Sequence, residues 1–338
     1  MNSYKRVMTA LDGKKPDSVP VMVFNRDWTM NHLGFSMQDL MCNVEKFVFA
    51  QYYCARTFGY DVVQDAHGIN AESEAMGCRL EFSEDFKIKI TDQPIKNYDE
   101  HLAELKIANP YSDGRLPRLL KQVKRLKELC GNELVVNSYI QAPFRQAAML
   151  RGNDVYRDII RNRDKLYDLL DIVLTNQIIY ATALVHAGAD VISISDPTSS
   201  GDVVSPQQWL DIGYRYIKEL VKHIKKTKVK VYLHICGDTN DRIDTFGSLD
   251  LDGISLDEKV DLEYARKKLG AKICIIGNVG TSNLLLNSPE EIAEESRMCI
   301  EKAGKDGSFI LCPGCGISKD CPPENIAAMV TAAKSYGY

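Results

Sequence analysis

The stretch Val229–Cys236 (VKVYLHIC) is short and rich in β-branched residues, which is typical of a buried β-strand. Segments of helical character separate it from similar runs, and two of these begin with Ser-Pro, at Ser205 and Ser288. A strand and a helix repeated eight times predict an α/β fold that closes into a (β/α)8 TIM barrel, although an open, doubly wound sheet shares much of the pattern. The seven other runs are Val19–Phe24, Asp61–Asp65, Leu134–Ile140, Asp190–Ser195, Asp252–Leu256, Lys272–Val279 and Ser308–Cys312.

One segment departs from this alternation. After the second predicted strand, Cys78–Phe82 and Phe86–Ile90 flank the polar turn Ser83-Glu84-Asp85, which predicts a β-hairpin insertion over residues 78–92. Its position after a strand would place it at the barrel mouth. No proline- or glycine-rich linker interrupts the chain, so we expect residues 1–338 to form a single barrel domain.

Charge and composition exclude several classes of function. The 338 residues include 42 Lys and Arg against 46 Asp and Glu, so there is no basic excess to bind nucleic acid. No run approaches the roughly 20 apolar residues that span a bilayer, and the start resembles no signal peptide, so we expect no membrane association and a cytoplasmic location. Ten cysteines should then stay reduced and available to metals.

The chemistry of such a barrel is expected at the carboxyl ends of its strands, where the loops converge. His234 and Cys236 lie two residues apart on one strand, so both can face the barrel interior. Taken alone, such a pair is more often a core histidine beside a core cysteine than a metal site. Cys312-Pro313-Gly314-Cys315-Gly316 ends the last strand on the same rim, and its glycines allow tight bends.

Three nitrogen and sulfur ligands at one mouth describe a catalytic zinc site with an open fourth position. The favoured ligands are His234, Cys236 and Cys315, with Cys312 as a competitor for Cys315. We expect most other cysteines to be small buried residues: Cys42, Cys54, Cys78, Cys130, Cys274 and Cys299, with Cys321 ambiguous.

Four motifs resemble the uroporphyrinogen decarboxylase superfamily, and within it the zinc-dependent, corrinoid-linked methyltransferases: His234–Gly237, Gly277–Val279, Ile310–Ile317 and Pro323–Ile326. The resemblance spans nearly the whole chain. It implies a (β/α)8 barrel, zinc bound by His234, Cys236 and Cys315, and a corrinoid carried by a separate partner protein.

The function implied by this resemblance is methyl transfer between a small methylated substrate and the cobalt of that corrinoid. We favour O-demethylation of an aryl methyl ether, with methylcobamide:thiol (coenzyme M type) transfer as the alternative. A third possibility is a uroporphyrinogen-type decarboxylase without metal. The segment after the first strand carries one arginine, Arg26, beside Asp27, which poorly suits a substrate with many carboxylates.

Residues near the first and third strand ends suit an aromatic ring. Phe24, Trp28 and Tyr139 can form its walls, and Arg26, Asn137 and Gln141 can anchor polar substituents, with core packing as the alternative for the aromatic residues. Arg26 and Arg145 are the cations available to an anionic thiol.

Acidic residues offer a fourth zinc ligand or a general acid. Glu74 and Asp196 are the first choices, and Asp65, His67 and Glu258 are further candidates. Asp196, just before Pro197, could instead cap the following turn.

Overall fold

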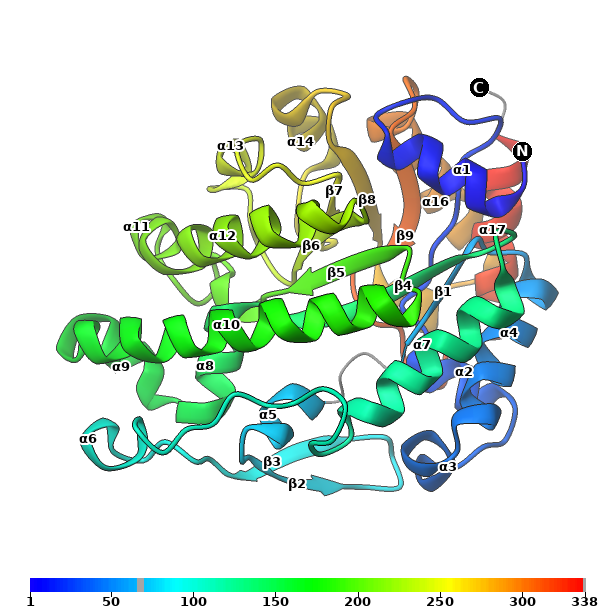
Figure 1. The fold of residues 1–338 in the computed structure, drawn as a ribbon. Coiled ribbons are helices and arrows are strands. Elements are labelled where there is room, and N and C mark those ends of the chain that lie inside the picture. Colours follow the sequence, from blue (N-terminus) through cyan, green and yellow to red (C-terminus); the bar gives the residue numbers. More distant parts are fainter. Residues whose placement is uncertain (66–69, 337–338) are drawn as a thin grey trace.

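A curled parallel sheet organises the chain (Figure 1). The computed structural model describes residues 1–65 and 70–336, and within these ranges seven strands pair in the order β1-β4-β5-β6-β7-β8-β9. Their order follows the chain, as expected for a repeated strand and helix unit. The strands are β1 (Val62–Gln64), β4 (Val135–Gln141), β5 (Val191–Ser195), β6 (Lys230–Ile235), β7 (Gly253–Leu256), β8 (Cys274–Val279) and β9 (Phe309–Pro313).

The expected first strand, Val19–Phe24, is reduced to a single parallel bridge between Val21 and Leu311. Leu311 N donates to Pro20 O at 2.9 Å, and Asp61 N donates to Val21 O at 2.8 Å. The segment therefore lies between β9 and the residue before β1, and connects the two edges of the curled sheet. The prediction of a full strand is wrong here because Pro20 has no N–H to contribute to a ladder.

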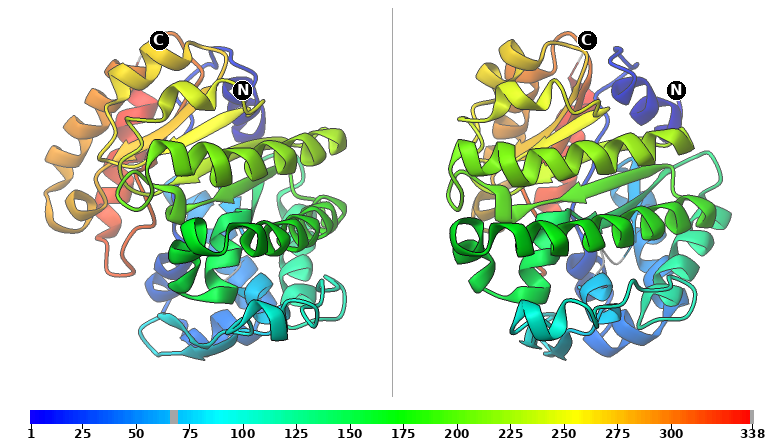
Figure 2. Two further views of the ribbon diagram at one scale, coloured as in Figure 1. Left: turned by 90° about the vertical axis from the view of Figure 1, so that its left-hand side faces the viewer. Right: turned by 60° about the vertical axis from the view of Figure 1, so that its left-hand side comes forward.

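Helices lie on the outer side of this curl (Figure 2). Strands β4, β5, β7, β8 and β9 are buried at every position, because the helices cover one face and the interior of the curled sheet covers the other. The helices, in chain order, are α1 (Ser3–Leu11), α2 (Arg26–His32), α3 (Met37–Cys42), α4 (Val44–Phe58), α5 (Ala71–Ala75), α6 (Tyr98–His101), α7 (Leu116–Cys130), α8 (Pro143–Arg151), α9 (Asp154–Arg161), α10 (Arg163–Ala187), α11 (Pro206–Gln208), α12 (Arg215–Ile224), α13 (Ile243–Phe246), α14 (Leu262–Leu269), α15 (Thr281–Leu286), α16 (Pro289–Ala303) and α17 (Pro323–Ser335). Single-turn or irregular segments are η1 (Pro197–Ser199), the π-helical η2 (Trp209–Tyr214) and η3 (Lys225–Thr227).

Both predicted Ser-Pro helix starts are confirmed. Ser205 and Ser288 each accept the N–H of the third residue of their helix, and Gln208 and Glu291 complete capping boxes.

Helix α1 closes the N-terminal end of the curled sheet. Its residues Val7, Ala10 and Leu11 join an apolar cluster of inward-facing strand residues that includes Ile276 and Cys312. Apolar side chains fill most of this end, so we expect a ligand to enter at the opposite end, where the strands finish.

Two strands stand outside the main sheet. Strands β2 (Arg79–Phe82) and β3 (Ile88–Asp92) pair antiparallel, with Phe82 opposite Ile88. They lie at the opposite end of the molecule from α1 (Figures 1 and 2).

Helix α10 departs from the expectation that no segment is long and apolar enough to cross a membrane. It has 25 residues and a mean hydropathy of 1.4 over its most apolar window, half of which is buried inside the fold. It packs against β4 and helices α7, α8 and α12, so its apolar residues serve the core of this structure.

Candidate active site

Three side chains from two strand ends converge at the open end of the sheet. His234 is the second-last residue of β6, Cys236 directly follows this strand, and Cys315 lies in the loop after β9. His234 Nε2 lies 3.0 Å from Cys236 Sγ, and Cys236 Sγ lies 3.3 Å from Cys315 Sγ. Among the described residues, these three form the group whose ligand atoms all lie within 4.8 Å of one another.

A contact of the ring nitrogen that faces away from the two thiols orients the imidazole of His234. His234 Nδ1 lies 3.0 Å from Ser255 Oγ on β7, and the parallel register pairs these two residues directly. The ring of Phe24 packs against the imidazole with 5.3 Å between centroids. With Nδ1 hydrogen-bonded and the ring only 8% exposed, Nε2 is the nitrogen left to face the two thiols.

Gly314 allows the Cys315 loop to approach the end of β7. A Cβ at Gly314 would lie 2.6 Å from the backbone nitrogen of Glu258, so only glycine fits there. Gly316 has open space around its Cα, so the expectation of a required glycine holds for Gly314 and not for Gly316.

The two thiols form a coupled pair. A hydrogen bond with Cys315 lowers the pKa of Cys236, and the same contact raises the pKa of Cys315 to about 12. Cys236 is therefore the first of the two to become a thiolate, with Cys315 as the donor.

The donor set fits a zinc ion. Tetrahedral zinc with Zn–S bonds of about 2.3 Å holds its ligand atoms about 3.5–3.8 Å apart, so the three atoms need only separate by a few tenths of an ångström. Two partly exposed thiols and a buried imidazole also leave one side of the cluster open. His234, Cys236 and Cys315 can therefore hold the metal that the sequence predicted.

Cys312 occupies a different environment. It lies near the end of β9, but it is fully buried in the apolar cluster inside the curled sheet, and burial raises its pKa well above the ordinary value. Burial also raises the pKa values of the other core cysteines: Cys54, Cys78, Cys130, Cys274, Cys299 and Cys321. The prediction that Cys42 is buried is wrong, because this residue ends α3 at the surface.

A cavity of about 360 Å³ opens beside the three ligands. Of the predicted substrate residues, Phe24, Arg26 and Tyr139 line it, whereas Trp28, Asn137 and Gln141 do not. The residues lining it are Phe24, Arg26, Asn70, Ile88, Tyr139, Arg145, Ser193, Ser195, Pro197, Tyr232, His234, Cys236, Cys315 and Gly316.

The three predicted residues outside the cavity have structural partners. Trp28 is 1% exposed, and its Nε1 donates to Cys321 O at 2.8 Å. Asn137 is buried inside the curled sheet, and its Nδ2 donates to Tyr232 Oη at 3.2 Å. Gln141 donates to Asn70 Oδ1 at 3.1 Å, so it contacts a residue of the cavity wall without lining the cavity itself.

The two favoured acids also lie outside the cluster. Glu74 forms an ion pair with Arg115 at 2.6 Å. Asp196 is buried and accepts hydrogen bonds from the hydroxyls of Thr198 and Ser199, which is the turn-capping role given as its alternative. His67 lies outside the described residues.

Arg145 is the second cation that the sequence analysis named for an anionic thiol, and it lines the cavity. It lies on α8, its Nη1 donates to Ser195 Oγ at 2.9 Å, and its guanidinium lies 5.5 Å from the centre of the Tyr139 ring. No carboxylate of the described residues forms an ion pair with it, whereas Arg26 is paired with Asp27. Arg145 therefore presents the less neutralised positive charge to the cavity.

The chain belongs to the uroporphyrinogen decarboxylase (URO-D) family, which residues 2–336 match. It is similar to the methylcobamide:CoM methyltransferase MtbA of Methanosarcina acetivorans, with 28% identity over 99% of this chain and 98% of that protein. The methylcobamide:CoM methyltransferase MtaA of Methanosarcina barkeri is also 28% identical, over 98% of this chain and 97% of that protein. A solved structure of a methyltransferase from Methanosarcina mazei superimposes with a TM-score of 0.90 at 26% identity, and 98% of each chain is covered. These findings confirm the resemblance stated from the motifs.

Proposed function

We propose that this protein is a zinc-dependent methyltransferase that moves a methyl group between a methylcobamide and a small thiol. The convergence of His234 Nε2, Cys236 Sγ and Cys315 Sγ beside a small cavity is the observation that carries the proposal. The similarity to methylcobamide:CoM methyltransferases over nearly the full length supports it.

The three metal ligands and the residues of the cavity wall have separate roles in the proposed reaction. Zinc bound there would act as a Lewis acid that favours the thiolate form of a substrate thiol at neutral pH. Arg145, with Arg26 on the same cavity, would orient a thiol that bears an anionic group. The deprotonated sulfur accepts the methyl group, cobalt keeps the electron pair of the cobalt–carbon bond, and the thiol proton leaves to solvent. Phe24, Tyr139 and Tyr232 limit the access of water to the sulfur.

We therefore favour methyl transfer to a thiol over O-demethylation of an aryl methyl ether as the function. Two of the six residues predicted to hold an aryl ether, Trp28 and Asn137, are engaged in the core instead. The cavity contains two arginines, which suit an anionic thiol better than a neutral ether.

A decarboxylase of a carboxylated tetrapyrrole fits less well. A cavity of about 360 Å³ suits a small molecule rather than four linked pyrroles, and Asp27 already neutralises one of its two arginines.

The proposal also covers the closure of the sheet into a barrel, the number of domains and the position of the hairpin. We infer a single (β/α)8 barrel domain over residues 1–338, in which the Val19–Phe24 segment takes the place of the eighth strand. Ile88 of β3 lines the cavity, which supports placing the hairpin at residues 78–92 at the mouth. A corrinoid protein would deliver its cobamide through this same opening, because α1 closes the other end.

A direct assay tests the function. Zinc-loaded protein is mixed with methylcobalamin and a thiol, with and without an anionic group, and loss of the methylcobalamin absorbance is followed. We expect thiol-dependent demethylation by the wild type and by Cys312→Ala, and none above background by Cys236→Ala. Equal rates for wild type and Cys236→Ala would refute the proposal. Turnover of an aryl methyl ether with cob(I)alamin, without any thiol reaction, would restore the ether reading.

A further inference from the structure

A fully buried arginine lies one loop away from Cys236. The side chain of Arg242, just before α13, is 0% exposed, and its charge is balanced by Asp241, whose Oδ1 accepts from Arg242 Nε at 2.7 Å. Burying a guanidinium costs free energy unless its N–H groups find acceptors. The acceptors of Arg242 therefore indicate which segments its burial stabilises.

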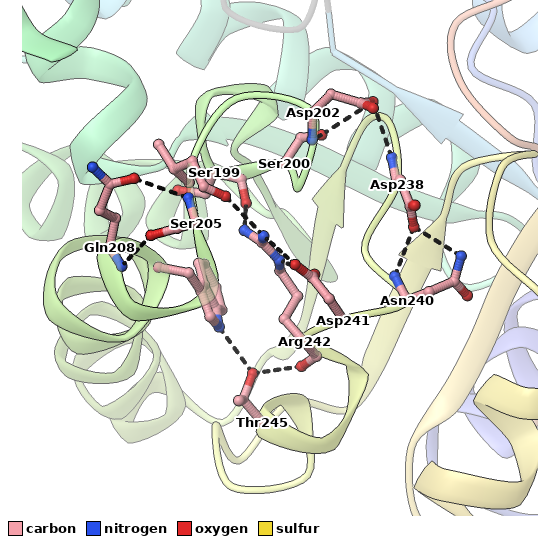
Figure 3. A network of polar contacts seen from close by, with 12 residues as sticks. Ser199, Ser200, Asp202, Ser205, Gln208, Asp238, Asn240, Asp241, Arg242 and Thr245 are labelled. Atoms are coloured by element: carbon pink, nitrogen blue, oxygen red, sulfur yellow. Dashed lines mark hydrogen bonds and ion pairs between the residues drawn. The ribbon is translucent and has the colours of Figure 1, made fainter.

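Those contacts reach the loop that follows β5. Arg242 Nη1 donates to Ser199 O, and Nη2 donates to Val204 O at 2.9 Å (Figure 3). A single planar guanidinium therefore binds both ends of the segment Ser199–Val204.

The Ser199–Val204 segment is also hydrogen-bonded to the residues that follow Cys236. Gly201 N donates to Asp238 O at 2.8 Å. Asp238 N donates to Asp202 Oδ2 at 3.2 Å (Figure 3). Lys259 Nζ lies 2.9 Å from Asp202 Oδ2 and adds the loop after β7 to this arrangement.

Gly237 connects the Ser199–Val204 segment to Cys236, because it directly follows Cys236 and packs against that segment. Its φ is +87°, and a Cβ there would lie 2.5 Å from Asp202 Oδ2 and 2.6 Å from Ser200 Oγ. The backbone directly after Cys236 is thus packed against Ser200 and Asp202, and a shift of that loop must move the Cys236 thiol.

We propose that Arg242 is a positioning residue for the Cys236 thiolate. It fixes the Ser199–Val204 segment against Gly237 and thereby sets the distance of Cys236 Sγ from His234 and Cys315. This inference rests on the proposed function, because it takes Cys236 to be a metal ligand.

Two variants and one control test it. Arg242→Lys keeps the charge but lacks the fork that reaches Ser199 O and Val204 O together. Asp202→Ala removes the acceptor of Asp238 N and Lys259 Nζ from a side chain that is 45% exposed, so the fold should tolerate it. Asp244→Ala is the control, because it removes an exposed ion pair with Lys268 on the helix next to Arg242.

The readouts are the visible spectrum of cobalt(II)-loaded protein, the zinc Kd from chelator competition, and circular dichroism to establish folding. We expect shifted cobalt d–d bands and zinc binding weaker by about 10-fold in Asp202→Ala, and by about 10- to 100-fold in Arg242→Lys if it folds. Asp244→Ala should match the wild type.

Wild-type spectra and zinc affinity in folded Asp202→Ala would overturn the positioning role, and that variant decides the matter if Arg242→Lys does not fold. A wild-type protein that binds neither zinc nor cobalt through thiolates would instead overturn the proposed function, and this inference with it.

Discussion

The apolar interior and the open end of the curled sheet contain the same kinds of residue in opposite settings. Inside the curled sheet, Cys274 and Cys312 are fully buried in an apolar cluster, and burial raises their pKa values. At the open end, Cys236 and Cys315 contact each other beside a cavity, and the pKa of Cys236 is lowered. Cys312 and Cys315 are three residues apart, so the surroundings and not the sequence distance decide which thiol can bind metal.

Substitution of the open-end cysteines should have the largest effect. We expect Cys236→Ala and Cys315→Ala each to lose zinc and to lower methyl transfer by about 10³-fold, since a metal Lewis acid contributes several kcal/mol. Metal analysis and the methylcobalamin assay measure both effects.

Cys312→Ala is the matched control in the apolar interior, and it should retain about one zinc per chain. Loss of zinc from Cys312→Ala with retention in Cys315→Ala would reverse the assignment of the third ligand.

Two buried carboxyl groups extend the comparison. At the closed end, Asp61 accepts from Arg6 Nη1 at 3.1 Å and from Val21 N at 2.8 Å. At the open end, Glu72 accepts from Gln141 N at 2.8 Å, but its second oxygen has no hydrogen-bond partner among the described residues. Burial raises the pKa of Glu72 from 4.5 to about 7.

This raised pKa predicts a pH dependence of stability. Between about pH 4.5 and 7 the folded protein keeps a proton on Glu72 that the unfolded chain releases, so the free energy of unfolding falls as pH rises, by about 3 kcal/mol in total. Glu72→Gln should remove this part of the pH dependence, as measured by denaturant unfolding at pH 5 and pH 8. Glu74→Gln is the control, and an unchanged pH dependence in Glu72→Gln would contradict the prediction.

The two cavity arginines should differ in their effect on the thiol. We expect Arg145→Met to raise the KM for an anionic thiol by about 10- to 100-fold, because a hydrogen bond to a charged group contributes about 1.5–3 kcal/mol. Arg26→Met should have a smaller effect, because Asp27 already pairs with Arg26. Steady-state kinetics with an anionic and a neutral thiol separate these effects. An equal rise in KM for both thiols would argue against charge recognition.

Removal of the hydroxyl behind His234 should have the smallest effect. Ser255→Ala leaves His234 Nδ1 without its partner, so we expect the zinc Kd to rise by about 10-fold. Chelator competition measures this change. No change in zinc affinity would show that other contacts orient the imidazole.

Strand periodicity predicted much of the fold and the ligand cluster. Seven of the eight expected strands are present, and the i, i+2 spacing of His234 and Cys236 predicted that they meet Cys315 at one rim. The prediction of a full first strand was wrong because the pattern of apolar residues takes no account of the N–H that Pro20 lacks.

The cavity wall was harder to predict because it depends on strand register. Tyr139 pairs with Ser193, which pairs with Tyr232, and all three line the cavity. Ser195 pairs with His234 in the next layer. A single sequence contains the spacing within each strand but not the pairing between strands. Arg145 comes from a helix, so inspection of strand ends gave it little weight, whereas Trp28 was overvalued because its indole reaches Cys321 O in the core.

The zinc content and X-ray absorption spectrum of purified wild-type protein and Cys236→Ala, prepared without chelators, test the central claim most directly. The account predicts about one zinc per wild-type chain, bound by two sulfur atoms and one imidazole nitrogen, and its loss from Cys236→Ala. A wild-type protein without zinc, or zinc bound without sulfur, would contradict the account.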